Sequence, residues 1–453
     1  MELFKASFLL TLTLLHLGGC LVSGSQLNVC SANITEANNG SISLLYKRIA
    51  AADNSTCMHF VWSIKSNDSN DFPSLFSAQT NNTTDACTRE CSSFVDKTNH
   101  TVNIPDAIDS YFSFGVVFTR LIEFIVPSDS AHSTEAFNES LNCECEKFPS
   151  NEMCQNYSMN YTTGIFLNDS NLEWSFHEAN QSFMAVLLDA ESGNETATRF
   201  TIRTNFPTTS EAGQRLSYFP HTLFTANTTT IDIIIENFPY NLSNISDYES
   251  KNFSRLALEL YVVHGPNTQN GSIVSATSLD DEYTPSVFTT MTYEMFQDDD
   301  VDAADETGFF QWKPISYQNS DRKSTASQQV NILYTGDQSF CNTGEIPNGL
   351  VKDLFGQNAS NVTRWFAVFG TSGDVSYFNN PFFTWTSIVG YGQVPEDSIS
   401  MIVIVTIIVG LGIPALLVLV GAVYVVIKKK PWQNVKRVVA KATGTSGGYT
   451  KLN

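Results

Sequence analysis

The chain has 453 residues, of which 42% are hydrophobic and 16% charged, and its formal net charge is −21. This acidic balance excludes nucleic-acid binding as the main role, because nucleic-acid binders need a positive surface. Between Ser25 and Ser400 there are 17 basic and 45 acidic residues. We interpret this excess as a means of staying soluble rather than as a cation site.

Residues 1–24 have the pattern of a secretory signal peptide. Lys5 precedes the apolar run FLLTLTLLHLG, and small residues follow at Val22 to Gly24. We therefore exclude this segment from the fold. Residues 25–398 are predicted to form a lumenal ectodomain.

The cysteines of this ectodomain predict disulfide bonds. An even number of cysteines behind a signal peptide is typical of an oxidising compartment, and the sequence leaves all 105 pairings of eight cysteines open. A zinc site is the competing interpretation for the group between Cys143 and Cys154, but paired C-x-x-C spacings and matching histidines are missing there. The disulfide candidates are Cys30, Cys57, Cys87, Cys91, Cys143, Cys145, Cys154 and Cys341.

Twenty N-x-S/T sequons predict a dense coat of N-linked glycans. One sequon is weak evidence, whereas twenty on the lumenal side of a secreted domain indicate a surface protected from proteases. Adjacent sites such as Asn81 and Asn82 cannot both be used reliably, so we expect most but not all to carry sugar. The sequons are Asn33, Asn39, Asn54, Asn67, Asn81, Asn82, Asn99, Asn138, Asn156, Asn160, Asn168, Asn180, Asn194, Asn227, Asn241, Asn244, Asn252, Asn270, Asn358 and Asn361.

The segments between the sequons are typical of β-strands. In RLALELYVV, apolar residues alternate from Leu256 to Val262, with Arg255, Glu259 and Tyr261 on the other face. RFTIRT alternates in the same way, and further runs such as HFVWSI, FSFGVVFTRLIEFIV, TTIDIIIENF, VNILYTG, RWFAVFG and FFTWTSIVGYG are rich in β-branched and aromatic residues. We expect an all-β ectodomain of two β-sandwich-like units, joined near the Asn-rich stretch after Tyr240.

Patterns associated with catalysis or metal binding are incomplete. GTSGG resembles a nucleophile elbow but has no strand and helix around it, and HEANQ at His177 lacks the second histidine of a metalloprotease. The acidic run DDDVDAADE, residues 298–306, lacks the glycine and glutamate of a calcium loop, which favours a solvated loop. We therefore predict no catalytic residue, no metal and no cofactor.

Aromatic residues gather in GFFQWKPISY, which contains Phe309, Phe310, Trp312 and Tyr317, and acidic and aromatic residues meet in SLDDEYTPSVF. In a β domain such residues usually form the core, which is the interpretation we prefer. The alternative is a partner-binding edge.

A single transmembrane helix is predicted over residues 399–427. The run from Met401 to Ile427 has 27 residues with Thr406 as its only polar side chain, and about 20 are enough to cross a bilayer. The tail, 428–453, holds seven Lys or Arg and no acid, which places it in the cytosol and makes the chain type I.

The tail contains a predicted sorting signal. GYTKL presents Tyr449 and Leu452 at tyrosine-x-x-apolar spacing, with Gly448 before them. An extended peptide of this kind can pair with a sheet edge of a clathrin-adaptor medium subunit and place the two side chains in separate pockets.

Six sequence blocks follow one another from Met58 to Pro414 and extend over nearly the whole mature chain: MHFVWS, VVFTRLIEF, DDEYTPSVF, GFFQWKPISY, WTSIVGYG and GLGIP. In these blocks the sequence resembles the glycosylated lysosomal membrane protein family. The longer cytosolic tail and the largely different cysteine positions depart from the vertebrate members, so no disulfide pairing is carried over.

The resemblance implies a non-enzymatic protein of the lysosomal membrane that serves as accessory subunit to a transporter of the major facilitator superfamily, which exports dipeptides. Its glycosylated ectodomain is then a lid that protects the transporter from lysosomal proteases. Two other classes of function remain open: an adhesion or receptor protein endocytosed from the cell surface, and a lumenal hydrolase whose site is assembled from distant residues.

Overall fold

A computed structural model describes most of the ectodomain strands and the membrane helix. The described residues are 28–35, 42–50, 56–64, 71–81, 87–96, 101–104, 112–125, 161–169, 172–177, 182–187, 198–205, 214–216, 219–225, 227–238, 254–266, 268, 271–277, 289–295, 308–322, 326–334, 345–356, 359, 361–370, 382–392, 394–395 and 401–429.

The described elements are almost entirely strands. They are β1 (Asn28–Thr35), β2 (Ile42–Ala50), β3 (Thr56–Ser63), β4 (Ser74–Asn81), η2 (Cys91–Ser93), β5 (Val95–Asp96), β6 (Thr101–Val102), β7 (Phe112–Ile125), β8 (Tyr161–Phe166), β9 (Leu172–His177), β10 (Ser182–Leu187), β11 (Thr198–Asn205), β12 (Gln214–Leu216), β13 (Phe219–Phe224), β14 (Thr228–Glu236), β15 (Ser254–His264), β16 (Ser272–Thr277), β17 (Thr289–Met295), β18 (Gly308–Trp312), β19 (Ile315–Tyr317), β20 (Ser327–Tyr334), α6 (Leu350–Phe355), β21 (Asn361–Phe369), β22 (Phe382–Tyr391) and α7 (Met401–Lys429). The prediction of an all-β ectodomain followed by one apolar helix is confirmed.

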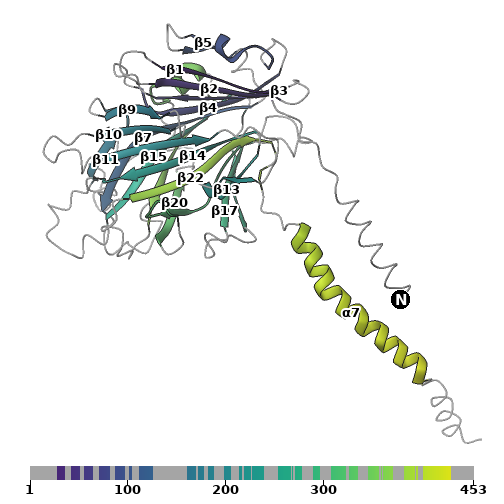
Figure 1. The fold of residues 1–453 in the computed structure, drawn as a ribbon. Coiled ribbons are helices and arrows are strands. Elements are labelled where there is room, and N and C mark those ends of the chain that lie inside the picture. The colour runs from purple at the N-terminus through teal and green to yellow at the C-terminus, as the bar shows by residue number, and fades with distance from the viewer. Residues whose placement is uncertain are drawn as a thin grey trace, which may run out of the picture. The chain divides into compact units, whose positions relative to one another are not determined.

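The strands build two antiparallel layers. The first sheet runs β1, β2, β3, β4, β7, β15, β21, β20, and β8 pairs with the later half of β7. The second sheet runs β9, β10, β11, β14, β22, β18, β17, β16. Figure 1 shows β1, β2, β3 and β4 of the first sheet side by side.

The main core lies between the two sheets. Alternate residues of β15, from Leu256 to Val262, join Phe200 and Ile202 of β11 in one buried cluster. This is the alternation that the sequence predicts, because successive side chains of a strand point to opposite faces. The short runs predicted as strands likewise all lie in β3, β7, β14, β20, β21 and β22.

One strand connects the two layers. Val330–Tyr334 of β20 pairs with β21 of the first sheet, and Ser327–Gln329 pairs with β19, which reaches β22 of the second sheet. The expectation of two sandwich-like units therefore needs correction, because residues 1–397 form one compact unit. Each sheet combines strands from before and after the Asn-rich stretch, with β7 paired to β15 in the first and β14 paired to β22 in the second, so that stretch is not a domain boundary.

A short helix covers part of the outer face of the first sheet. Val351 and Phe355 of α6 join a second buried cluster with Phe76, at a ring separation of 5.3 Å between the two phenylalanines. A Cβ on Gly115 of β7 would lie 2.5 Å from a methyl group of Val351. Glycine therefore allows α6 to pack directly on the strand.

The aromatic block GFFQW forms core, as preferred from sequence. Phe309, Phe310 and Trp312 are at most 1% exposed, and Trp312 meets Trp365 and Trp385 with ring centroids 6.0 and 6.5 Å away. The near-perpendicular ring planes are the geometry that aromatic pairs favour. A partner-binding edge made by this block is excluded, whereas DDEYTPSVF lies outside the described residues.

Candidate functional site: sequons, buried polar clusters and the membrane helix

Five of the predicted glycosylation sites fall within described residues. Asn33 lies in β1, Asn81 ends β4, Asn168 follows β8, Asn227 precedes β14, and Asn361 begins β21. Four of the five therefore stand at or beside strand ends, and Asn33 stands on a strand whose described pairing is with β2 alone. This placement suits glycans, because strand ends and edges face solvent while the faces of the two sheets pack.

Among the cysteine candidates whose side chains the structure describes, three are disulfide-bonded. Cys57 at the start of β3 is bonded to Cys87, with Cα atoms 5.4 Å apart, within the usual range for a disulfide. Cys91 in η2 is also disulfide-bonded. Cys30 lies in β1, whereas Cys143, Cys145, Cys154 and Cys341 lie outside the described residues.

A fully buried histidine adjoins this disulfide. The Nδ1 atom of His59 lies 2.7 Å from the Tyr46 hydroxyl, and its Nε2 atom lies 2.8 Å from Oγ1 of Thr80 and 3.4 Å from Sγ of Cys57. Burial, and then the positive charge of Arg48, lower the pKa of His59 to about 3. Both ring nitrogens have neighbours within hydrogen-bonding distance, so we interpret His59 as a neutral structural residue even in an acidic lumen.

The depressed pKa of His59 predicts a loss of stability in acid. The unfolded histidine takes up a proton below its ordinary pKa of 6.5, whereas the folded one does not until about pH 3, so the free energy of unfolding falls across this window. Between pH 6.5 and about pH 5, His59 should lower the free energy of unfolding by about 2 kcal/mol. In urea unfolding of the full chain in detergent, His59→Gln should reduce the stability difference between about pH 7 and about pH 5 by roughly that amount. If the stability difference between the two pH values is the same in the parent and the variant, the lowered pKa of His59 is contradicted.

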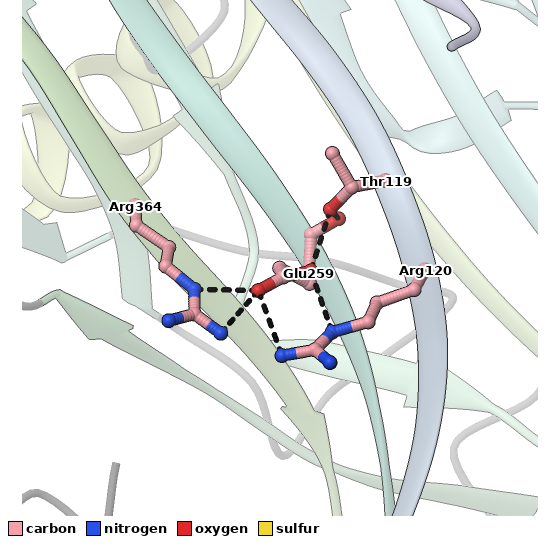
Figure 2. A network of polar contacts seen from close by, with 4 residues as sticks. All are labelled: Thr119, Arg120, Glu259 and Arg364. Atoms are coloured by element: carbon pink, nitrogen blue, oxygen red, sulfur yellow. Dashed lines mark hydrogen bonds and ion pairs between the residues drawn. The ribbon is translucent and has the colours of Figure 1, made fainter. Parts of the chain in front are cut away.

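A buried carboxylate lies on the outer face of the first sheet (Figure 2). Glu259 of β15 is 3% exposed and receives hydrogen bonds from Arg364 of β21 and from Arg120 and Thr119 of β7. Arg120 Nε lies 2.7 Å from one carboxylate oxygen, and the Thr119 hydroxyl donates to the same oxygen at 2.7 Å. The cluster thus ties three neighbouring strands together through one side chain.

A β-bulge explains how β7 supplies two adjacent side chains to this cluster. The register between β7 and β15 shifts between Glu259 and Leu260, whose partners are Arg120 and Phe118. Thr119 is the additional residue, and a bulge lets two successive side chains oppose one residue of the partner strand. Regular alternation would not place Thr119 and Arg120 on the same face. The sequence motif VVFTRLIEF gave no signal for this, although it is one of the blocks that resemble the family.

The second sheet has a matching cluster on its own outer face. Asp232 of β14 is fully buried and is paired with Arg322 at 2.5 Å and with Arg203 of β11 at 3.8 Å. The hydroxyl of Thr386 in β22 donates to the other oxygen of Asp232 at 2.7 Å. Arg322 has a φ of 52°, a left-handed conformation that is uncommon for a residue other than glycine.

The chemistry of both clusters indicates a structural role. In each, an arginine and a threonine hydroxyl lie within hydrogen-bonding distance of the oxygens of a single buried carboxylate, and a second guanidinium group adds an ion pair. Such an oxygen is poorly placed to take a proton from a substrate, because its lone pairs are already engaged. Within the described ranges, no three His, Cys, Asp or Glu residues gather in a group that could hold a metal ion.

Removing the shared carboxylate should destabilise the fold strongly. Glu259→Gln leaves two arginines without their buried counter-charge, and breaking such a pair typically lowers the free energy of unfolding by about 3–5 kcal/mol. Urea unfolding of the full chain in detergent measures the change. Glu90→Gln is the matched control, since Glu90 is exposed and its replacement should change stability by no more than about 0.5 kcal/mol. Equal effects of the two variants would show that the cluster does not stabilise the sheet.

The apolar helix forms a separate unit with the chain that follows it. Residues Thr406–Lys428 of α7 are long and apolar enough to cross a membrane, and they are exposed along their length. Near the cytosolic end, the Lys428 ammonium lies 5.4 Å from the centre of the Tyr424 ring. The predicted sorting residues Gly448, Tyr449 and Leu452 lie outside the described residues, so that signal stays a prediction.

Comparison with known proteins identifies the family. The family described as glycosylated lysosomal membrane protein matches residues 45–431. The chain belongs to this family. A glycosylated lysosomal membrane protein of Danio rerio is 25% identical over 372 residues, which cover 80% of each chain. A Bos taurus member is 26% identical over 70% of this chain and 69% of the relative, and Xenopus laevis member A is 30% identical over 47% and 49%.

Membership of the glycosylated lysosomal membrane protein family establishes where the chain works. Together with the apolar helix α7, it places a single-pass protein in the lysosomal membrane with its ectodomain in the lumen. Among solved structures, a complex of ER glucosidase II aligns with a TM-score of 0.16 and 9% identity over 83% of this chain and 34% of that chain. A likeness this low carries no argument about fold or activity.

Proposed function

We propose that this chain is a non-enzymatic accessory subunit that protects a lysosomal transporter from proteolysis. The partner would be a multi-spanning protein of the major facilitator superfamily that exports dipeptides, as the family resemblance implies. The observation that carries the proposal is a β-sandwich with sequons at its strand ends, linked to a single membrane helix. Glycans at these positions hinder protease access while leaving the sheets intact.

The buried polar groups support a structural rather than a catalytic ectodomain. His59 is enclosed by Tyr46, Thr80 and Cys57, and the carboxylates of Glu259 and Asp232 are each engaged by two arginines. Each of these clusters fixes neighbouring strands of one sheet. A rigid domain of this kind opens rarely, and resistance to proteolysis depends on how rarely a chain opens.

The membrane helix offers one face for close contact with a partner. A helix turns by about 100° per residue, so Gly410, Pro414 and Gly421 lie on one side of α7 and Gly412 lies on the opposite side. An added Cβ at Gly410 or Gly421 would meet nothing within 4 Å. Small residues let another helix backbone approach closely, which is how helices associate in membranes.

The glycine face provides the test of the partnership. Replacing Gly410 and Gly421 by leucine should reduce the amount of transporter that co-purifies in mild detergent and shorten the transporter's lysosomal half-life, because bulky side chains prevent close helix packing. Gly412→Leu is the matched control, since it adds the same side chain on the opposite side of the helix. Mass spectrometry of the purified complex identifies the partner, and pulse-chase measurements give its lifetime.

The outcomes separate the possible roles. A stoichiometric transporter that is lost in the Gly410/Gly421 variant and retained in the Gly412 variant supports the proposal. If both variants retain the transporter equally, the glycine face of α7 is excluded as the binding surface, and the ectodomain must make the contact. Recovery of extracellular ligands without a transporter would contradict the proposal and favour an endocytosed receptor.

The proposed tail signal predicts a change of location. Tyr449→Ala should move the protein toward the cell surface, because losing a buried aromatic anchor weakens adaptor binding by about 2 kcal/mol, or some thirtyfold. Surface biotinylation measures the shift, and Thr450→Ala, at a position between the two anchor residues, is the matched control. If the Tyr449→Ala protein reaches the lysosome as efficiently as the parent, the sorting signal lies elsewhere, for instance on the partner.

A further inference from the structure

One aromatic ring of the described ectodomain stands in solvent. Phe166, the last residue of β8, is 49% exposed, and among the strand residues whose burial the structure describes, Val274 is the only other exposed large apolar side chain. Single exposed apolar residues are ordinary on protein surfaces, so the exposure of Phe166 gains meaning only from the residues that surround the ring.

The turn that follows Phe166 is held rigidly. The backbone N–H of Asp169 donates to the Phe166 carbonyl at 3.0 Å, which makes Phe166 the first and Asn168 the third residue of the turn. Between them, Leu167 is fully buried, and its carbonyl accepts a hydrogen bond from the Trp174 indole at 3.2 Å. Phe166 and Asn168 are thus fixed at the same end of β8, close in space as well as in sequence.

The ring of Phe166 is also held in place by its cross-strand neighbour. Arg120 lies directly opposite Phe166 in the register of β7 and β8, and its guanidinium carbon is 5.8 Å from the ring centre. Arg120 is in turn paired with the buried Glu259 at 2.7 Å. Arg120 therefore contacts part of the Phe166 ring, and the rest of the ring remains exposed.

The sequence indicates what covers that surface. Of the twenty sequons, only the one at Asn168 has an aromatic residue two positions before the asparagine. The apolar face of an N-acetylglucosamine ring carries C–H groups that stack favourably on an aromatic ring, in the same way that polarised C–H edges do in proteins. A sugar on Asn168 starts within the turn that fixes Phe166.

We propose that Phe166 is the docking platform for the first N-acetylglucosamine of an N-glycan on Asn168. The glycan then becomes a packed part of the fold at this position, rather than a mobile chain on its surface. This assignment concerns a sugar of the protein itself and does not rest on the transporter partnership. Its failure would leave the proposed accessory role untouched.

A two-by-two comparison of variants tests the contact. Ser170→Ala removes the sequon without changing Asn168, and Phe166→Ala removes the ring. Glycosylated full chains are purified in detergent, and their melting temperatures are compared. Ser170→Ala should lower the melting temperature by about 2 °C when Phe166 is present and by less than about 0.5 °C when it is alanine. The loss of the Arg120 contact occurs in both Phe166→Ala proteins and so cancels in the comparison.

A control and a second readout complete the design. Ser272→Ala removes the sequon at Asn270, which has Thr268 two positions before it, so its effect should be the same with and without Phe166. Glycopeptide mass spectrometry gives the occupancy of Asn168 in each protein. The proposal is overturned if Asn168 carries no sugar in the parent protein, or if Ser170→Ala has the same effect in both backgrounds.

Discussion

The ectodomain depends on one apolar layer enclosed between two antiparallel sheets. Trp312, Trp365 and Trp385 come from three different strands, and Trp312 packs against the other two inside this layer. Each sheet would expose an apolar face if it stood alone, so neither is a stable unit by itself. This explains why strands from distant parts of the sequence combine in one compact body and why β20 serves both sheets.

The outer faces of the two sheets follow a common physical rule. Each carries one buried carboxylate, Glu259 or Asp232, that is held by two arginines and a threonine. A buried acid is tolerated only when its charge is matched and its lone pairs are engaged.

The arrangement also fits the accessory role that we propose, which needs no conventional active site. Strand ends and edges carry the described sequons, while sheet faces are taken up by packing, by α6 and by the charged clusters. In the proposed function, sugars on these sequons extend from the periphery of a rigid body, and α7 attaches that body to the membrane. The protection that we propose needs only these two properties.

The sequence by itself determined the strand segments, the membrane helix, the sequons and the all-β class, because alternation, apolar length and short motifs are local properties. It also predicted that GFFQW is core. Only the tertiary structure decided that there is one sandwich, because pairing between distant strands such as β7 and β15 leaves no local pattern. The same holds for the bulge at Thr119 and Arg120, for the enclosure of His59 and for the exposure of Phe166. Whether a side chain is buried, paired or exposed depends on which strand lies opposite it, and that is fixed only when the whole chain has folded.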